Sequence, residues 1–209
     1  MLLALDLSTA HGSIAVVHGD DVLYQSSFQS ERSHNAQVFA PLKEALAAAG
    51  NHLTGIVIGN GPGSYTGVRI AIAAAQGIAL SRNIWCAAWC SLAGLDLDTP
   101  ATYQIIGDAR RQSFYLARVE NGRLLPDLEI ISAEIAQKKA SDCGIWYTTD
   151  PKAPLNLPVQ IAKPDAAKLA KIVQSLPPDE LAALIAQPLI PHYLAEAFIT
   201  LPKRPLPPP

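Results

Sequence analysis

Two carboxylates in this 209-residue chain follow apolar segments in similar local sequences. Asp6-Leu7-Ser8-Thr9 ends the first such segment, and Asp108-Ala109-Arg110-Arg111 follows one in the second half. Nucleotide-binding hairpins place carboxylates in this way, but they need glycines so that backbone amides can approach phosphate. Ser8 and Arg110 occupy those places, so carboxylates that cap turns are an equally good interpretation. The candidate vestigial nucleotide or anion site comprises Asp6, Ser8, Thr9, Asp108, Arg110 and Arg111.

A glycine-rich loop, residues 59–69 (GNGPGSYTGVR), lies between a predicted strand and a predicted helix. Backbone amides at such a helix start can meet an anion. The Gly-Lys-Ser/Thr ending of a phosphate-binding P-loop is absent, however. Ser64 also stands where the dinucleotide fingerprint has its last glycine. The loop therefore predicts a tight turn in which Ser64 or Thr66 caps the helix.

The usual arrangements for metal binding and nucleophilic catalysis are missing. A helical metal site would need a second histidine four residues after His34, and that position is Val38. Cys86 and Cys90 have no second pair of ligands, and no Gly-x-Ser-x-Gly elbow is present. We therefore expect no metal, no cofactor and no catalytic residue.

Hydrophobic periodicity predicts an α/β fold with a mixed sheet flanked by helices. The first half has the order βββαβαβ, with helices at 33–49 and 66–82. The second half repeats the pattern more loosely and suggests a smaller lobe. We expect an N-terminal lobe at 1–98, a C-terminal lobe at 99–201 and a proline-rich, disordered tail at 202–209. Predicted strands cover 2–7, 13–17, 22–28, 54–59, 84–87, 103–107 and 113–119, with a third strand of the second lobe after Arg123 and short helices at 133–139 and 165–175.

The helix at 66–82 carries small residues every four positions. Ala71, Ala75 and Ala79 form one row, and Ala73 and Gly77 form a second. Small side chains let a neighbouring backbone approach closely, although glycine in a helix costs about 1 kcal/mol relative to alanine. The neighbour is either the sheet of this chain or a helix of another chain, and the spacing does not decide between them.

Composition excludes several classes of protein. Hydrophobic residues make up 49% of the chain and charged residues 16%, which is typical of a folded domain. A net charge of -2 argues against general coating of nucleic acid. No apolar stretch approaches the ~20 residues that span a bilayer, and the N-terminus is a poor signal peptide. Three cysteines form no disulfide framework, so we expect a cytoplasmic protein.

Several motifs together resemble one family, the TsaB (YeaZ) proteins. Glu31-Arg32-Ser33-His34, the run GPGSYTGVRI at 61–70 and Asp108-Ala109-Arg110-Arg111 occur in that order in the family. Asp6-Leu7-Ser8-Thr9 is close to its opening Asp-Thr-Ser-Thr. Pro191-His192-Tyr193-Leu194 resembles its C-terminal Pro-x-Tyr-Leu-Arg, with Ala195 in place of the arginine.

The resemblance implies a two-lobed, actin-like ATPase (ribonuclease H-like) fold that has lost its catalysis. It implies a scaffold that activates TsaD in threonylcarbamoyl transfer to adenosine 37 of tRNAs reading ANN codons, with TsaE as a further partner. Arg110 and Arg111 are candidates for holding an acidic partner or a phosphate backbone, and the sequence does not decide whether the chain touches tRNA. When TsaD is absent, an exposed apolar strip on the same helices could pair two copies of this chain as a homodimer. The alternatives are an M22-type metallopeptidase and an independent actin-like ATPase. The implied partner-binding residues are Arg32, His34, Val38, Leu42, Tyr65, Thr66, Arg69, Ala71, Ala75 and Ala79.

Overall fold

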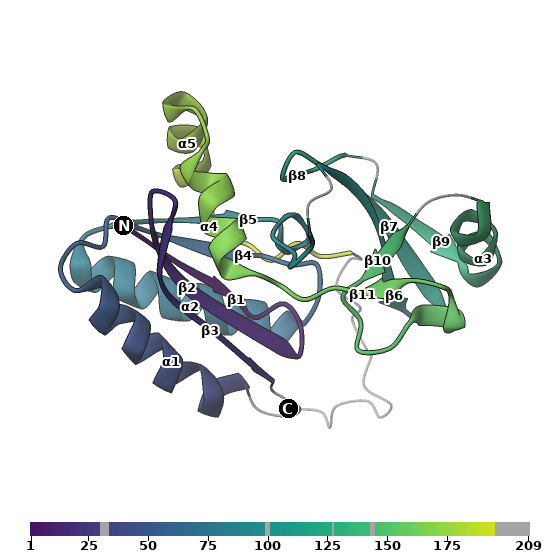
Figure 1. Ribbon diagram of the computed structural model, residues 1–209, viewed down its shortest axis with the longest axis horizontal. Coiled ribbons are helices and arrows are strands. Elements are labelled where there is room, and N and C mark those ends of the chain that lie inside the picture. Colours follow the sequence, from purple (N-terminus) through teal and green to yellow (C-terminus); the bar gives the residue numbers. More distant parts are fainter. Residues whose placement is uncertain (30–33, 99–100, 127, 143–144, 195–209) are drawn as a thin grey trace, which may run out of the picture.

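The computed structural model describes residues 1–29, 34–98, 101–126, 128–142 and 145–194, and at 34–36 and 141–142 it describes the backbone alone. Two lobes stand side by side, each built around one sheet (Figure 1). Among the described residues, no helix combines the length and apolar character needed to cross a membrane. The α/β class with two mixed sheets is confirmed.

The first lobe has the order βββαβαβ that the sequence predicts. Its sheet runs β3-β2-β1-β4-β5, with the first three strands antiparallel and the last two parallel to β1. The parallel pairs require the crossover helices α1 and α2. The elements are β1 (Leu2–Asp6), β2 (His11–His18), β3 (Asp21–Gln29), α1 (His34–Ala49), β4 (Gly55–Gly59), α2 (Tyr65–Arg82) and β5 (Trp85–Trp89).

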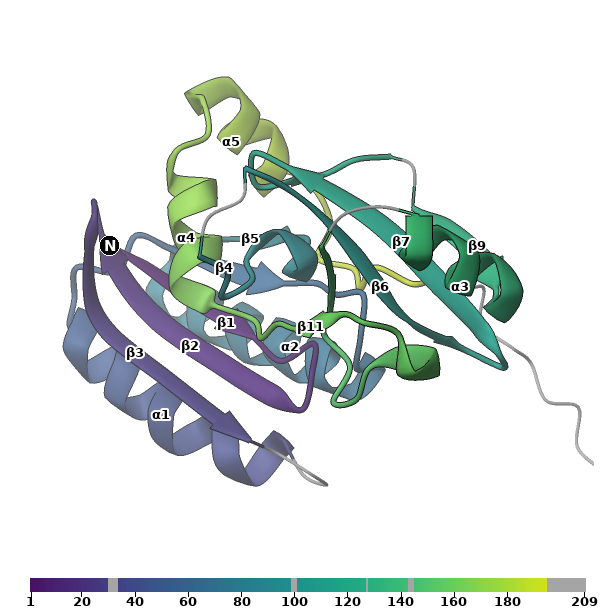
Figure 2. The same cartoon turned by 45° about the vertical axis from the view of Figure 1, so that its right-hand side comes forward.

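Helices cover both faces of the first sheet, which explains why all of β1 is buried. Side chains alternate between the faces of a strand. Leu3 and Leu5 therefore pack in the core beneath α1 and α2. Leu2 and Ala4 face the opposite side and pack with α4 (Ala166–Gln174). Figure 2 shows α1 and α2 on one side of β1 and β2, and α4 on the other.

The second lobe is a looser copy of the first. Its sheet runs β11-β10-β6-β7-β8, and β9 pairs with β7. The strands at β6 and β7 confirm the sequence prediction, whereas β9, β10 and β11 were not predicted. The elements are β6 (Thr102–Arg110), β7 (Ser113–Glu120), β8 (Arg123–Leu124), β9 (Glu129–Ser132), α3 (Ala133–Asp142), β10 (Trp146–Thr148) and β11 (Gln160–Ile161), with 3-10 turns at Ser91–Ala93 and Pro154–Asn156.

The chain returns to the first lobe after β11, so the expected boundary of the second lobe at 99–201 is wrong for the helices that follow. The buried face of α4, which includes Leu169 and Val173, packs on the first sheet. Leu181 and Leu184 of α5 (Pro178–Ile185) pack against the same cluster. An amphipathic pattern reveals that a helix has a buried face but not which sheet covers it. The expected tail at 202–209 lies outside the described residues.

The first alanine row of α2 faces the sheet of its own chain. Ala71 and Ala75 have no exposed surface, and Ala79 is 7% exposed. In α1, Val38 is fully buried and Leu42 is 5% exposed. The expectation that these five side chains contact a partner is therefore wrong. A helix that crosses over a sheet must bury one face there, and the small side chains bring α2 close to β4 and β5.

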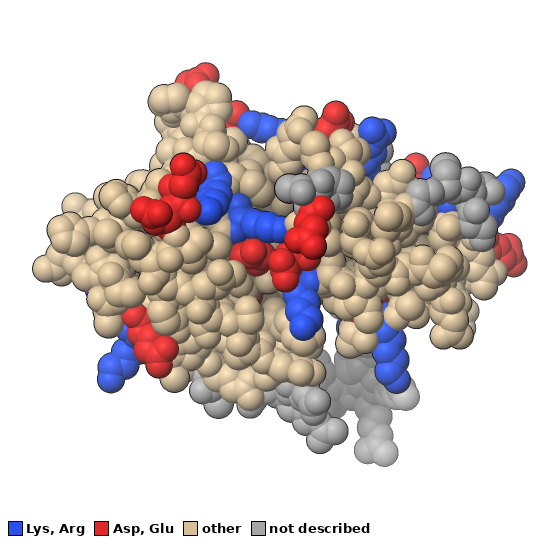
Figure 3. Space-filling view, in the orientation of Figure 1, with Lys and Arg blue, Asp and Glu red and all other residues tan. Residues whose placement is uncertain are grey.

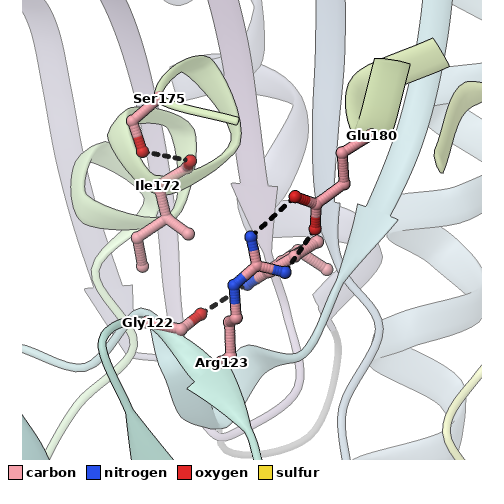
Figure 4. A network of polar contacts seen from close by, with 6 residues as sticks. Gly122, Arg123, Ile172, Ser175 and Glu180 are labelled. Atoms are coloured by element: carbon pink, nitrogen blue, oxygen red, sulfur yellow. Dashed lines mark hydrogen bonds and ion pairs between the residues drawn. The ribbon is translucent and has the colours of Figure 1, made fainter. Parts of the chain in front are cut away.

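An ion pair, a cation–π contact and a hydrogen bond join the two lobes near α5 (Figure 4). Arg123 of β8 makes a two-pronged ion pair with Glu180, in which its Nη2 lies 2.8 Å from Oε2. The Arg123 guanidinium also lies 5.6 Å from the centre of the Trp89 ring. The indole Nε1 of Trp89 donates to the Gly122 carbonyl at 2.8 Å. These contacts link β5 and α5 of the first lobe to β8 of the second.

Two glycines of α2 should respond oppositely to alanine. A Cβ at Gly77 meets nothing within 4 Å, whereas a Cβ at Gly67 falls 1.9 Å from the Leu7 carbonyl oxygen. Gly77→Ala should raise the free energy of unfolding by about 1 kcal/mol, because alanine is the better helix former. Gly67→Ala should lower it, because β1 or α2 must move. Urea denaturation measures both, and a shift of the same sign in the two variants would contradict this packing.

Candidate functional sites: the cleft and the outer face of α2

A cleft of about 550 Å³ separates the two lobes. The first lobe supplies the turn after β1, with Ser8 and Thr9, and the start of α2. The second lobe supplies the end of β6, with Asp108 and Arg110, and the loop after β10. The structure thus brings four of the six predicted anion-site residues to one cavity. Asp6 lies beneath Ser8, and Arg111 is at the exposed tip of the β6–β7 hairpin.

Asp6 is buried at the floor of the cleft. Its side chain is 1% exposed, and Oδ1 accepts a hydrogen bond from the Ser8 amide at 2.9 Å. Within the described part of the chain, neither Asp6 Oδ2 nor Ser8 Oγ has a partner that meets hydrogen-bond geometry. Gly59 on the neighbouring β4 makes the room, because a Cβ there would lie 1.9 Å from Oδ2. Ser8 therefore lines the cleft, and the buried Asp6 carboxyl group lies beneath it, close to the Ser8 and Ser91 hydroxyls.

Burial raises the pKa of Asp6 above its ordinary value. The loss of hydration disfavours the carboxylate, and the Ser8 amide bond and the nearby Ser8 and Ser91 hydroxyls only partly offset this effect. A carboxyl group in this setting retains its proton to higher pH than an exposed one.

Asp108 repeats the local geometry of Asp6, as the similarity of the two sequences predicts. Its Oδ1 accepts from the Arg110 amide two residues later, at 2.7 Å. In both lobes the carboxylate accepts a hydrogen bond from the amide two residues later. Both carboxylates therefore cap turns, which confirms that interpretation of the sequence. The Arg110 side chain is 86% exposed and lies 3.5 Å from Asp108 Oδ2.

The β6–β7 hairpin holds three consecutive residues in left-handed backbone. Arg110, Arg111 and Gln112 have φ values of 73°, 54° and 63°. Asn-Gly usually occupies a two-residue hairpin loop of this kind, because side chains larger than glycine crowd the backbone. The two arginines are therefore exposed at a strained hairpin tip beside the cleft.

The loop after β10 contributes residues that the sequence analysis missed. Asp150 Oδ2 accepts from the Asp108 amide at 2.8 Å, and Thr149 Oγ1 lies 3.5 Å from the hydroxyl of the cleft residue Tyr115. Burial is the main cause that raises the pKa of Asp150. A short apolar segment followed by Asp, already noted at Asp6 and Asp108, was the available signal. On this wall of the cleft, two acidic side chains, Asp108 and Asp150, outnumber one basic side chain, Arg110.

The start of α2 forms the third side of the cleft. Ser64 is the N-cap, and its Oγ accepts from the Gly67 amide at 3.1 Å, which confirms the predicted cap. The Ser64 amide donates to the Ser8 carbonyl at 2.5 Å. Gly63 has a φ of 153° and would place a Cβ 2.1 Å from that carbonyl oxygen. A glycine there lets the loop lie directly on the turn after β1.

The opposite face of α2 is exposed and has small residues at its centre. We call Thr66, Arg69, Ala73, Gly77 and Leu80 the outer α2 strip. Leu80 is 86% exposed, and Gly77 borders open space. On the neighbouring α1, Phe39 is 60% exposed. In Figure 3 the surface over α1 and the β3 edge carries few charged side chains, whereas charges gather nearer the lobe boundary.

The predicted partner-binding residues therefore divide into groups. Tyr65, Thr66 and Arg69 are exposed at the start of α2, and the Arg69 Nη1 donates to the Tyr65 hydroxyl at 2.5 Å. The five residues discussed above are in the core. Arg32 and the side chain of His34 lie outside the described residues. The four-residue spacing identified two faces of α2, and the resemblance assigned the partner to the face that the sheet of this chain covers.

Potential metal ligands are not gathered in the part of the chain that the structure describes. There, no group of three or more His, Cys, Asp or Glu side chains is arranged to hold a metal ion. Burial raises the pKa of the Cys90 thiol to about 12, so this cysteine is a poor nucleophile.

Comparison with known proteins identifies relatives. The family model for TsaD, described as tRNA N6-adenosine threonylcarbamoyltransferase, matches residues 28–172, more than half of the chain. The Haemophilus influenzae protein named tRNA threonylcarbamoyladenosine biosynthesis protein TsaB is 28% identical over 149 residues, 64% of this chain and 63% of that protein. The Bacillus subtilis protein of the same name is 31% identical over 144 residues, again 64% and 63%.

The chain thus matches less than two thirds of the length of these curated relatives. The Escherichia coli protein TsaB is 36% identical over 87 residues, which is 40% of this chain and 37% of that protein. In contrast, the solved structure of YeaZ from Pseudomonas aeruginosa matches 92% of this chain and 99% of its own, with a TM-score of 0.65 at 24% identity. A second Pseudomonas aeruginosa structure, described as similar to peptidase YeaZ, gives 0.69 at 24% identity, with 93% and 99% covered. These two structures confirm the fold.

Replacing the buried carboxyl group should alter the pH dependence of stability. Because the pKa of Asp6 is raised in the folded state, the folded protein holds more protons than the unfolded chain from about pH 3.9 upward, until that raised pKa is passed. The free energy of unfolding should therefore fall through this window as pH rises. Asp6→Asn keeps an oxygen for the Ser8 amide but cannot ionise.

Chemical denaturation at a series of pH values measures the effect. The stability of Asp6→Asn relative to the natural chain should increase as pH rises above about 4, up to the raised pKa of Asp6. A stability difference that stays constant, or one that decreases over this range, would show that Asp6 does not titrate as its burial implies.

Proposed function

The chain belongs to the TsaB (YeaZ) proteins within the TsaD family, and we propose that it is a non-catalytic subunit that binds and activates TsaD. In this proposal TsaD transfers a threonylcarbamoyl group to adenosine 37 of tRNAs that read ANN codons, and this chain holds TsaD in its active arrangement. The observation that carries the proposal is the outer α2 strip, an exposed helix face with small residues at its centre.

The shape of the outer α2 strip suits helix packing. Ala73 and Gly77 are four residues apart, so their exposed backbone lies on one side of the helix. A partner helix can approach closely there, and Leu80 and Phe39 supply apolar surface at the edges. Burial of such surface contributes on the order of 25 cal/mol per Å² before the costs of association. In the absence of TsaD, a second copy of the chain could occupy the same face as a homodimer.

TsaE and tRNA enter the proposal as further partners of the assembled complex. Arg110 and Arg111 are exposed at the tip of the β6–β7 hairpin, where guanidinium groups suit phosphate oxygens. The adjacent Asp108 and Asp150 restrict this attraction to the tip. We expect any tRNA contact of this chain to involve the hairpin tip rather than the cleft.

A second candidate function is residual nucleotide or anion binding in the cleft. The observation in its favour is the buried Asp6 carboxyl group beneath Ser8, next to the side of the cleft that the start of α2 forms. Calorimetric titration of the isolated chain with magnesium-ATP tests it, and binding that is lost in Ser8→Ala would support it over a purely structural role. The metallopeptidase alternative has weaker support, because the position four residues after His34 is Val38, which is fully buried.

Gly77→Arg should break the complex with TsaD while the chain stays folded. The new side chain extends into open space, and arginine is a better helix former than glycine. It would nevertheless block close approach of a partner helix. The affinity for TsaD should fall at least tenfold, about 1.4 kcal/mol. Calorimetry with purified TsaD measures this, together with a threonylcarbamoylation assay of tRNA.

Ala182→Arg is the matched control. Ala182 is an exposed small residue on α5, which lies on the opposite side of the first sheet from α1 and α2 (Figure 1). This variant should bind TsaD like the natural chain. Unchanged affinity in Gly77→Arg, or an equal loss in Ala182→Arg, would mean that TsaD does not bind the outer α2 strip.

A further inference from the structure

The chain crosses the cleft once more after α5. We call residues 188–194 the C-terminal strap. Figures 1 and 2 show this segment in yellow, running from below α5 between the first sheet and the second. Its last four residues, from Pro191 to Leu194, line the cleft together with Ser8 and Asp108. The strap is therefore part of the cleft wall rather than a distant terminus.

One backbone hydrogen bond and one from a side chain attach the strap to the first lobe. The His192 amide donates to the Asn60 carbonyl at 2.8 Å, and Asn60 Nδ2 donates to the Ile190 carbonyl at 3.3 Å. Leu189 packs against the core cluster beneath α1 and α2. Asn60 directly follows β4, so the strap is fixed at the end of a central strand.

Two side chains at the far end of the strap cross the cleft mouth. The Tyr193 ring lies 5.6 Å from the Tyr65 ring, which starts α2. The Arg69 guanidinium lies 5.0 Å from the centre of that Tyr65 ring. Leu194 packs instead against the cluster that contains Tyr103 and Ile105 of the second lobe. Seven consecutive residues thus contact both lobes.

The strap is not packed tightly on the lobe beneath it. A cavity of about 250 Å³ lies between the strap and the first lobe, bordered by Asn60, Ala88, Leu184 and His192. Asn60 Oδ1 is buried and has no hydrogen-bond partner among the described residues. An unpaired buried acceptor weakens this attachment. The Tyr193 side chain near the end of the strap is already 54% exposed, so its release would uncover little further surface of that ring.

We propose that the C-terminal strap is a releasable lid that bridges the lobes and limits access to the cleft. Its seat depends on the Tyr193–Tyr65 contact and on the packing of Leu194. When these contacts break, residues 190–194 leave the cleft mouth while Leu189 keeps the strap anchored. This property is independent of the proposed partner, because it belongs to the isolated chain.

The test uses the full chain with Tyr193→Ala and Leu194→Ala combined. Ile190→Ala is the matched control, because Ile190 is 61% exposed and only its carbonyl is used in the strap. Amide hydrogen exchange at His192 measures how firmly the strap is seated. A neutral gadolinium chelate in solution measures access to the cleft, through the relaxation of the Thr9 and Asp150 amide protons.

The double variant should exchange the His192 amide at least tenfold faster than the control. Relaxation of the Thr9 and Asp150 amides by the chelate should at least double. Unchanged exchange would show that these side chains do not hold the strap, and faster exchange without greater relaxation would show that it is no lid. Either result overturns the proposal. If the double variant fails to fold, Tyr193→Ala alone is measured against the same control.

Discussion

The close packing of α2 on the first sheet is the contact on which the other features depend. Ala71, Ala75 and Ala79 allow the helix to approach the strands, and Gly67 lets its first turn rest on the Leu7 carbonyl. This contact fixes the start of α2 over the turn after β1, where it forms one side of the cleft. It also fixes which side of the helix remains exposed. The cleft and the outer α2 strip are therefore two consequences of one packing arrangement.

The cleft retains the outline of a ligand site but little that would favour an anion. Asp6 and Asp108 form the same carboxylate-to-amide turn in the two lobes, which reflects the repeated architecture. Ser8 and Arg110 stand at the two turn positions where a nucleotide-binding hairpin needs glycine to bring backbone amides close to phosphate. Asp150 adds negative charge to the second-lobe wall, and the chain's own strap crosses the mouth. These features favour a role in which the chain acts through its surface.

Much of the first lobe was predictable because its signals are local. Periodicity located α1 and α2, the Ser64 cap marked the start of α2, and the repeated Asp motif anticipated the two matching turns. The choice of neighbour was not local. The four-residue alanine spacing defines a face of α2 but does not reveal whether a sheet or a partner covers it. In the same way, the pattern of α4 did not show that it returns to the first lobe. Asp150 was missed because its strand is short and pairs with β6, which is distant in the sequence.

The central claim is that the outer face of α1 and α2 is the contact surface for TsaD. Hydroxyl-radical footprinting of the natural chain, with and without TsaD, tests it most directly because it reads exposed side chains one by one. Phe39 and Leu80 should lose reactivity when TsaD is added, while the exposed Ile130 and Ile135 of the second lobe should not. Protection confined to the second lobe, with Phe39 and Leu80 unchanged in a formed complex, would contradict the account.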